Sequence, residues 1–209
     1  MALYGVYGAG GCGRGILPIV REQLELGDRL VFVDDKAGAA VNGHQVVSFA
    51  EFVASDADEK RICIAVANGA IRSKLVAQCS AAGLQFYSVH HDSCIKMDAV
   101  EIGEGALFSP FTTVTSNARI GRHFHCNLYS YIEHDCVIGD FVTFAPAVKC
   151  NGNVTIGDGA YVGAGATIRQ GLNIGARATI GMGAVVTKGV PAGETWVGNP
   201  ARPISVKPG

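Results

Sequence analysis

The feature that most constrains this chain is a six-residue repeat that runs from Ile102 to Val186. Every sixth residue is apolar and the register never slips: Ile102, Phe108, Val114, Ile120, Cys126, Ile132, Ile138, Phe144, Cys150, Ile156, Val162, Ile168, Ile174, Ile180 and Val186. A second position follows four residues after each of these and is never charged: Ala106, Thr112, Ala118, Phe124, Ser130, Cys136, Val142, Val148, Val154, Ala160, Ala166, Leu172, Ala178, Ala184 and Val190. Helices repeat every 3.6 residues and strands every two, so the period of six instead predicts a parallel β-helix.

In such a fold, three hexads form one triangular coil of 18 residues, and the fifteen hexads predict five coils. The large apolar residue of each hexad is expected to fill the prism, and the small one is expected at a tight corner. We place this all-β domain at residues 93–209, with regular hexads over 102–191 and a cap over 192–209 that covers the last open coil.

Residues 1–92 show a different pattern, which is typical of a Rossmann-like α/β domain. The order is a strand (3–7), a glycine-rich segment (8–15), a helix (16–26) with Pro18 in its first turn, a strand (30–33) and the pair Asp34 and Asp35. A short loop, a helix (48–54), a strand (61–67), a helix (70–82) and a strand (86–89) follow. About four strands and three helices are too few for a full dinucleotide fold, so a mononucleotide-type ligand is favoured over NAD.

The glycine-rich segment offers a phosphate site at Gly10, Gly11, Cys12 and Gly13. Glycine allows the backbone to approach a phosphate closely, and the following helix presents unpaired N–H groups at its positive end. Asp34 and Asp35 stand at about the spacing that places a carboxylate near a ribose. The alternative is a tight strand-to-helix turn that binds nothing.

Composition excludes several classes of protein. A net charge of −1 gives no electrostatic case for nucleic-acid binding. No apolar run reaches the roughly 18 residues of a membrane span, and no signal peptide is recognised, so a cytoplasmic protein is expected. The seven cysteines form no C-x-x-C pair, which predicts small core residues and no metal site.

One hexad carries a candidate for catalysis, because Glu133, His134 and Asp135 follow the inward Ile132 and face outward at the next corner. Nearby carboxylates favour the imidazolium and fix the tautomer, so His134 is a candidate general base. Residues 18 apart share a corner, which sets Gly152 beside His134 and predicts room for a ligand and an accessible N–H. The alternative is that Glu133, His134 and Asp135 form a solvated polar turn. In the segment that connects the two domains, His90 and His91 are expected to be a cap or a solvent-exposed pair.

The repeat, and the ending at Gly181–Lys188 and Val197–Arg202, resemble the left-handed β-helix of the hexapeptide-repeat acyltransferases. With the glycine-rich segment and Asp34–Asp35 ahead of it, the whole chain is similar to the sugar O-/N-acyltransferases. These include bacillosamine- and perosamine-type N-acetyltransferases and sialic acid O-acetyltransferases. The resemblance implies a homotrimer with acetyl-CoA in the groove between adjacent β-helices and a nucleotide-sugar held by the N-terminal domain.

The resemblance also implies roles for individual residues. His134 would be the general base, with Glu133 or Asp135 raising its basicity and Asn127 in the same site. The substrate would contact Gly10 to Gly13, Asp34, Asp35 and Asn68. Acetyl-CoA would contact Thr143, Gly152, Gly163, Gly181 and Lys188. The chain departs from the family at Cys12 and Thr143, where His is usual, and at Ala67, where Gly is usual.

Three functions remain open at this point. The first is N-acetylation of the 4-amino group of a nucleotide-linked deoxy sugar from acetyl-CoA, in the synthesis of bacterial surface glycans. The second is O-acetylation of a sugar hydroxyl, which also needs a base. The third is a non-catalytic nucleotide-binding scaffold, which the departures at Cys12 and Thr143 would favour and the intact Glu133-His134-Asp135 turn opposes.

Overall fold

The computed structural model describes residues 1–36 and 38–204. The described chain divides into two compact units, Met1–Val89 and a second unit that begins at His90. The sequence-based boundary lies a little later, after residue 92. Each unit has its own hydrophobic core.

The first unit contains one six-stranded sheet in the order β3-β4-β2-β1-β5-β6. Its strands are β1 (Ala2–Tyr7), β2 (Arg29–Val33), β3 (Ala40–Val41), β4 (His44–Val47), β5 (Glu59–Ile64) and β6 (Gln85–Phe86). Its helices are α1 (Gly11–Glu22), α2 (Phe49–Ala54) and α3 (Gly69–Ala81). The central strands β2, β1 and β5 are parallel, so their carboxyl ends meet at one edge of the sheet.

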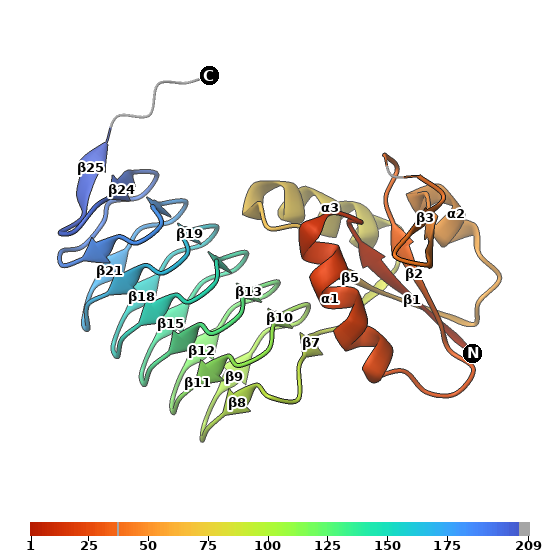
Figure 1. Cartoon of the computed structure of the whole chain (residues 1–209), viewed down its shortest axis with the longest axis horizontal. Coiled ribbons are helices and arrows are strands. Elements are labelled where there is room, and N and C mark those ends of the chain that lie inside the picture. Colours follow the sequence, from red (N-terminus) through yellow and green to blue (C-terminus); the bar gives the residue numbers. More distant parts are fainter. Residues whose placement is uncertain (37, 205–209) are drawn as a thin grey trace. The chain divides into compact units, whose positions relative to one another are not determined.

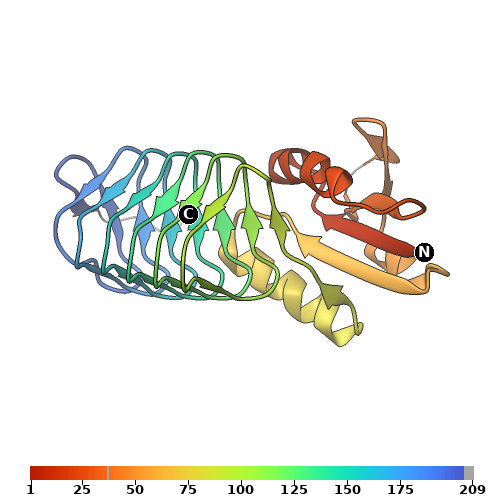
Figure 2. The ribbon, with the colours of Figure 1, turned by 90° about the horizontal axis from the view of Figure 1, so that it is seen from below.

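Helices cover both faces of this sheet. Figure 2 shows α1 and α3 on opposite sides of β1 and β5. Phe52 of α2 and Cys79 of α3 share a core with Leu3, Val33 and Ile62 of the strands. Successive side chains of a strand point to opposite faces of the sheet, so one strand can pack against helices on both faces.

The structure corrects the prediction for α1. The helix begins at Gly11 and not near Ile16, so Gly11 and Gly13 lie within its first turn. Pro18, which was expected in the first turn, therefore lies in the helix interior. The low helix propensity of glycine concealed this early start. The short loop expected before α2 contains the hairpin of β3 and β4.

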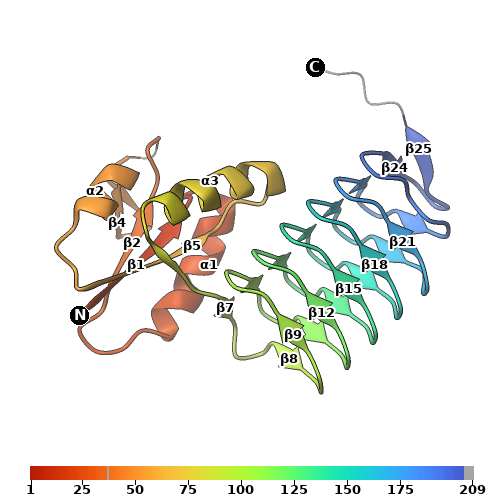
Figure 3. The same cartoon turned by 180° about the vertical axis from the view of Figure 1, so that it is seen from behind.

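The second unit is a parallel β-helix, and Figures 1 and 3 show its coils stacked along one axis. Its strands form three sheets: β7-β10-β13-β16-β19-β22-β24-β25, β8-β11-β14-β17-β20-β23 and β9-β12-β15-β18-β21. The bounds are β7 (Val89–His90), β8 (Ile95–Lys96), β9 (Glu101–Ile102), β10 (Leu107–Phe108), β11 (Thr113–Val114), β12 (Arg119–Ile120), β13 (His125–Cys126), β14 (Tyr131–Ile132), β15 (Val137–Ile138), β16 (Thr143–Phe144), β17 (Lys149–Cys150), β18 (Thr155–Ile156), β19 (Tyr161–Val162), β20 (Thr167–Ile168), β21 (Asn173–Ile174), β22 (Thr179–Ile180), β23 (Val185–Val186), β24 (Thr195–Val197) and β25 (Arg202–Ile204).

The inward positions predicted by the repeat are confirmed. The large apolar residues from Phe108 to Val186 each expose 4% or less, and Ile102 packs against the same core from its end. Every residue of the second position is buried as well. Strand partners are 18 residues apart, as in the pair of Ile132 with Cys150. The prism is therefore filled as the period of six requires.

Both ends of the β-helix differ in detail from the hexad pattern. β8 already pairs in parallel with β11, so the coils begin before Ile102. Lys96 is exposed at the end of this strand, which is why the apolar pattern did not reveal it. At the other end, Trp196 and Ala201 join the core, and β24 pairs with β22 and β25. Residues 205–209 of the expected cap lie outside the described residues.

Each coil turns at three corners, and residues 18 apart form a column along each corner. Asn117, Asp135 and Asn153 occupy one column with φ between +57° and +60°. Asn and Asp tolerate this left-handed conformation better than other side chains with a Cβ. The corner that holds the predicted site is thus built from residues suited to its backbone.

Candidate functional site

The turn Glu133-His134-Asp135 connects β14 to β15 at this corner. Asp135 N donates to Ser116 O at 3.1 Å, and Asn153 N donates to His134 O at 2.9 Å. These bonds link successive coils and confirm that His134 stacks beside Gly152. The site is therefore fixed by the backbone of the prism and not by a flexible loop.

His134 and Asp135 form a hydrogen-bonded pair. His134 Nδ1 lies 2.8 Å from Asp135 Oδ2, and the side chain of His134 remains about half exposed, at 48%. The bond to Asp135 raises the pKa of His134, and the charges of Asp135 and Glu133 act in the same direction. With Nδ1 protonated toward the carboxylate, the network assigns Nε2 as the acceptor. The pair has the arrangement of a general base and the group that orients it.

Sequence reasoning missed Asn117, which supports Asp135 from the preceding coil. Its Nδ2 donates to Asp135 Oδ1 at 3.2 Å. The bonds from His134 and then Asn117 lower the pKa of the Asp135 carboxyl, so this group stays charged. Stepping back 18 residues from Asp135 along the repeat would have found this residue.

Gly152 serves a different purpose from the one predicted. A Cβ at this position would lie 2.5 Å from His134 Cε1 and 2.6 Å from His134 Nε2. The space expected for a ligand is therefore filled by the imidazole ring of His134 itself. Glycine is needed here because a Cβ would overlap the imidazole ring of His134.

The Gly152 N–H, predicted as an accessible donor, already has an acceptor. It donates to Glu133 Oε2 at 3.0 Å. Of the two carboxylates flanking His134, Asp135 thus orients the ring, whereas Glu133 binds the neighbouring coil. An oxyanion would have to displace the Glu133 carboxylate to use this N–H.

The Asp135 interaction predicts a measurable shift in the titration of His134. In the free protein, NMR should place the imidazole midpoint above its ordinary value, because Asp135 stabilises the charged form. Asp135→Asn keeps a residue that tolerates φ of +59° but removes the charge, so the midpoint should fall. An unchanged midpoint in Asp135→Asn would show that the carboxylate does not control the basicity of His134.

The other predicted acyltransferase residues fall on two corners of the prism and on one sheet. Asn127, Gly163 and Gly181 are spaced by multiples of 18 residues and share the corner after β13, β19 and β22. Asn127 Oδ1 accepts from Leu128 N at 2.9 Å. Lys188 is exposed and lies on the same column as His134, three coils further on. These two corners bound the sheet that contains β14, β17, β20 and β23.

Thr143 lies within the neighbouring sheet, in β16, with His125 and Tyr161 as its strand partners. It is buried despite its outward position in the repeat. Nothing in the described structure tests the predicted contact of Thr143 with acetyl-CoA, and that role stays a prediction.

In the first unit, the glycine-rich segment forms the start of α1. Gly10 is the N-cap, and a Cβ at Gly10, Gly11 or Gly15 would meet no atom within 4 Å. Gly13, in contrast, packs directly against the carbonyl oxygen of Gly8. Burial raises the pKa of the Cys12 thiol, and the charge of Arg72 opposes this effect. The backbone is thus open to a ligand at Gly10 and Gly11 and is closed at Gly13.

The predicted acids hold the loops at the carboxyl edge of this sheet. Asp34 Oδ2 accepts from Ala9 N at 2.9 Å, which ties β2 to the glycine-rich segment. Asp35 Oδ1 accepts from Phe49 N at 2.9 Å at the start of α2. Asn68 Oδ1 caps α3 through Ile71 N at 3.0 Å. Each carboxylate keeps lone pairs beyond these bonds, so a ribose hydroxyl remains compatible with both.

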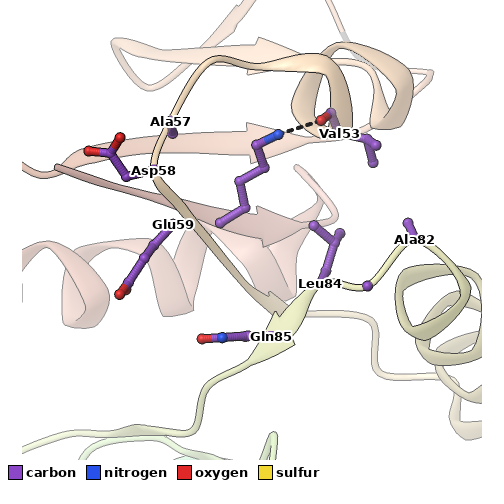
Figure 4. A pocket seen from close by; sticks show the side chains of 9 residues that line it. Val53, Ala57, Asp58, Glu59, Ala82, Leu84 and Gln85 are labelled. Atoms are coloured by element: carbon purple, nitrogen blue, oxygen red, sulfur yellow. Dashed lines mark hydrogen bonds between the residues drawn. The ribbon is translucent and has the colours of Figure 1, made fainter.

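A separate hollow of about 290 Å³ lies at the other end of β5. Figure 4 shows its lining by Asp58, Glu59 and Gln85, and Lys60 Nζ there donates to Val53 O at 2.6 Å. It is lined by residues at the amino end of β5 and beyond the carboxyl end of α3. The carboxylates and the negative end of the helix dipole disfavour binding of an anion there. This hollow is not part of the predicted nucleotide site.

Residues 1–36 and 38–204 contain neither a candidate metal site nor a membrane-spanning helix. No cluster of three or more His, Cys, Asp or Glu side chains is arranged to hold a metal ion. No helix in these ranges has the length and apolarity needed to cross a membrane.

Comparison with known proteins defines the class as a bacterial hexapeptide-repeat acyltransferase. Residues 153–188 match the bacterial transferase hexapeptide family (six repeats), and residues 5–79 match the PglD N-terminal domain. The chain is 49% identical to GDP-perosamine N-acetyltransferase of Escherichia coli O157:H7, over 100% of this chain and 99% of that protein. The chain therefore belongs to the family of perosamine- and bacillosamine-type sugar N-acetyltransferases, and its β-helix is of the left-handed type.

Solved structures agree over nearly the full length. WeeI from Acinetobacter baumannii AYE has a TM-score of 0.95 and 50% identity, covering 98% of this chain and 100% of that one. The acetyltransferase domain of PglB from Neisseria gonorrhoeae FA1090, in complex with acetyl coenzyme A, has a TM-score of 0.89 and 28% identity, covering 97% and 98%. The resemblance inferred from the repeat and the glycine-rich segment is confirmed.

Proposed function

We propose that this enzyme transfers the acetyl group of acetyl-CoA to the 4-amino group of GDP-perosamine. The structural observation that carries the proposal is the 2.8 Å bond between His134 Nδ1 and Asp135, at a corner fixed by the prism. The relative that is 49% identical over the whole chain bears the name of this activity. Such a product belongs to the synthesis of a bacterial surface glycan.

In the proposed mechanism, the amine nitrogen attacks the thioester carbonyl carbon and His134 Nε2 accepts the proton that the nitrogen loses. The charge of Asp135 stabilises the resulting imidazolium. As the tetrahedral intermediate collapses, the C–S bond breaks and the leaving sulfur of CoA takes up the proton held by the His134 imidazolium, which releases the free thiol and restores the neutral base. Direct transfer of this kind requires correct positioning and a base, without a covalent acyl-enzyme.

The Gly152 N–H is the proposed donor to the oxyanion of the intermediate. In the described structure it bonds to Glu133, so substrate binding must release Glu133 from this N–H. A released Glu133 carboxylate lies next to His134 in the chain and adds negative charge beside the imidazolium. Glu133 would therefore act as an exchangeable partner of Gly152.

The acetyl-CoA site is proposed to lie along the two corners that carry Gly163, Gly181 and Lys188. Acetyl-CoA is bound by the related PglB domain. A homotrimer would place these corners against a second copy and complete each site between subunits. The trimer and a cytoplasmic location both stay predictions.

O-acetylation remains the second candidate function. The pairing of His134 with Asp135 suits deprotonation of a hydroxyl at least as well as that of an amine. A non-catalytic scaffold is disfavoured by this same pairing, which such a protein would not need.

Release of free thiol tests the proposal against both alternatives. The wild-type protein should release CoA from acetyl-CoA in the presence of GDP-perosamine, and only slowly with GDP-linked sugars that lack an amine. GDP-perosamine should also raise the midpoint of thermal unfolding, since a specific ligand stabilises the folded state. Equal release with hydroxyl and amino sugars would favour O-acetylation, and ligand protection without release would favour a scaffold.

A further inference from the structure

Arg72 is fully buried in the first turn of α3, with an exposed fraction of 0%. Burying a guanidinium is costly unless hydrogen bonds compensate for the loss of water. Burial lowers the pKa of Arg72 to about 10, which still leaves it charged at neutral pH. A permanent buried cation at this place is a feature that core packing alone does not require.

The guanidinium holds the segment that connects β5 to α3. Arg72 Nη1 donates to Val66 O at 2.7 Å and to Ala67 O at 3.1 Å. Asn68, the next residue, caps the same helix with its side chain. The side chain of Arg72 therefore reaches back over its own helix N-terminus and fixes the conformation of residues 66–68.

The same segment supports the glycine-rich turn that follows β1. A Cβ at Gly8, where φ is +104°, would lie 3.1 Å from Ala65 O and 3.2 Å from Val66 Cγ2. Cys12, in the first turn of α1, is close enough for the charge of Arg72 to oppose the effect of burial on its thiol. Two loops from the carboxyl ends of neighbouring parallel strands thus meet around one buried cation.

We infer that Arg72 is a positioning residue for the nucleotide: it locks residues 66–68 against the glycine-rich turn and places a positive charge beneath the site of a nucleoside diphosphate. The inference rests on the proposed function, since it assumes that this edge of the sheet binds the nucleotide-sugar. Arg72 acts through the two loops and through its charge, without touching the reacting atoms. A neutral or shorter side chain would leave Val66 O and Ala67 O without this donor.

Two substitutions separate the charge from the hydrogen bonds. Arg72→Gln removes the charge, and Arg72→Lys keeps it but replaces the planar guanidinium, whose Nη1 donates to both carbonyls, by an ammonium group on a shorter side chain. Arg61→Gln is the matched control, because Arg61 lies on β5, is partly exposed and pairs with Glu59. The full-length proteins should be compared by KM for GDP-perosamine, KM for acetyl-CoA, and the dissociation constants of GDP and guanosine.

Arg72→Gln is expected to raise KM for GDP-perosamine on the order of tenfold and to leave KM for acetyl-CoA unchanged. The affinity for GDP should fall more than the affinity for guanosine, because only GDP carries the diphosphate. Arg72→Lys should recover part of the lost affinity for GDP. If Arg72 has a purely structural role, Arg72→Gln would lower the affinities for GDP and guanosine equally and would lower the midpoint of thermal unfolding. This result would overturn the inference.

Three further outcomes are decisive. If Arg72→Gln does not fold, Arg72→Lys with a KM equal to that of the wild type would overturn the inference. If the wild type binds GDP-perosamine but neither variant changes its KM, only the role of Arg72 is lost. If the wild type binds neither GDP nor GDP-perosamine, the proposed function falls as well.

Discussion

His134→Ala is expected to lower kcat/KM for acetyl transfer on the order of a hundredfold or more. The substitution removes Nε2, the proposed proton acceptor, and leaves a corner whose backbone is held by the adjacent coils. Since the imidazole is proposed to contact the reacting amine and not the body of CoA, KM for acetyl-CoA should change little. Steady-state release of free thiol with GDP-perosamine measures both quantities.

Gln78→Ala provides a control for His134→Ala. Gln78 is exposed in α3 and belongs to neither the proposed acetyl-CoA site nor the proposed nucleotide site. Its truncation should leave kcat/KM within about twofold of the wild-type value, as is usual for an exposed residue without a special role. A His134→Ala variant as active as Gln78→Ala would remove His134 from the mechanism.

Gly152→Ala is expected to lower kcat/KM roughly ten- to a hundredfold, because small misplacements of a catalytic group are costly. The added Cβ would lie 2.5 Å from His134 Cε1, so the ring must rotate away from its position beside Asp135. The residue has no positive φ, and its N–H is retained, so the loss would report on the ring alone. The measurement is again thiol release, together with the NMR titration of His134.

A double-mutant cycle tests this explanation. In the His134→Ala background the clash is absent, so Gly152→Ala should cost little further activity. Gly38→Ala, at an exposed position with open space, controls for the loss of glycine. Additive losses at Gly152 and His134 would mean that Gly152 acts independently, through its backbone or the fold.

The β-helix could be predicted almost completely from the sequence, because one repeat determines both burial and register. The period of six placed Phe144 in the core and set Ile132 beside Cys150, and the structure has both. A position that breaks the apolar pattern carries no such signal. Lys96 ends a strand of the first coil, and only its pairing in space reveals this.

The order of strands and helices in the first unit was predictable except for the hairpin of β3 and β4, but the start of α1 was not. Glycine is a poor helix former, so Gly11 and Gly13 predicted a loop, whereas they form the first turn of α1. Packing decided the outcome, since Gly13 sits against the Gly8 carbonyl where no side chain fits. Propensity alone does not contain that tertiary contact.

For the candidate site, the repeat predicted which residues are neighbours but not how their side chains are oriented. It placed Gly152 beside His134, yet it did not show that the ring covers Gly152 or that Glu133 accepts from the Gly152 N–H. Rotamers and hydrogen bonds depend on atoms from three coils at once. Asn117 was missed for the same reason, because its role appears only through Asp135.

The central claim is that this chain N-acetylates a nucleotide-linked amino sugar, and the structure of the product tests it most directly. NMR and mass spectrometry should be applied to the nucleotide-sugar recovered after incubation of the wild-type protein with acetyl-CoA and GDP-perosamine. We expect one acetyl group in amide linkage at C4 and one equivalent of free CoA. An acetyl ester on a hydroxyl, or an unchanged GDP-perosamine under conditions where it binds, would contradict the claim.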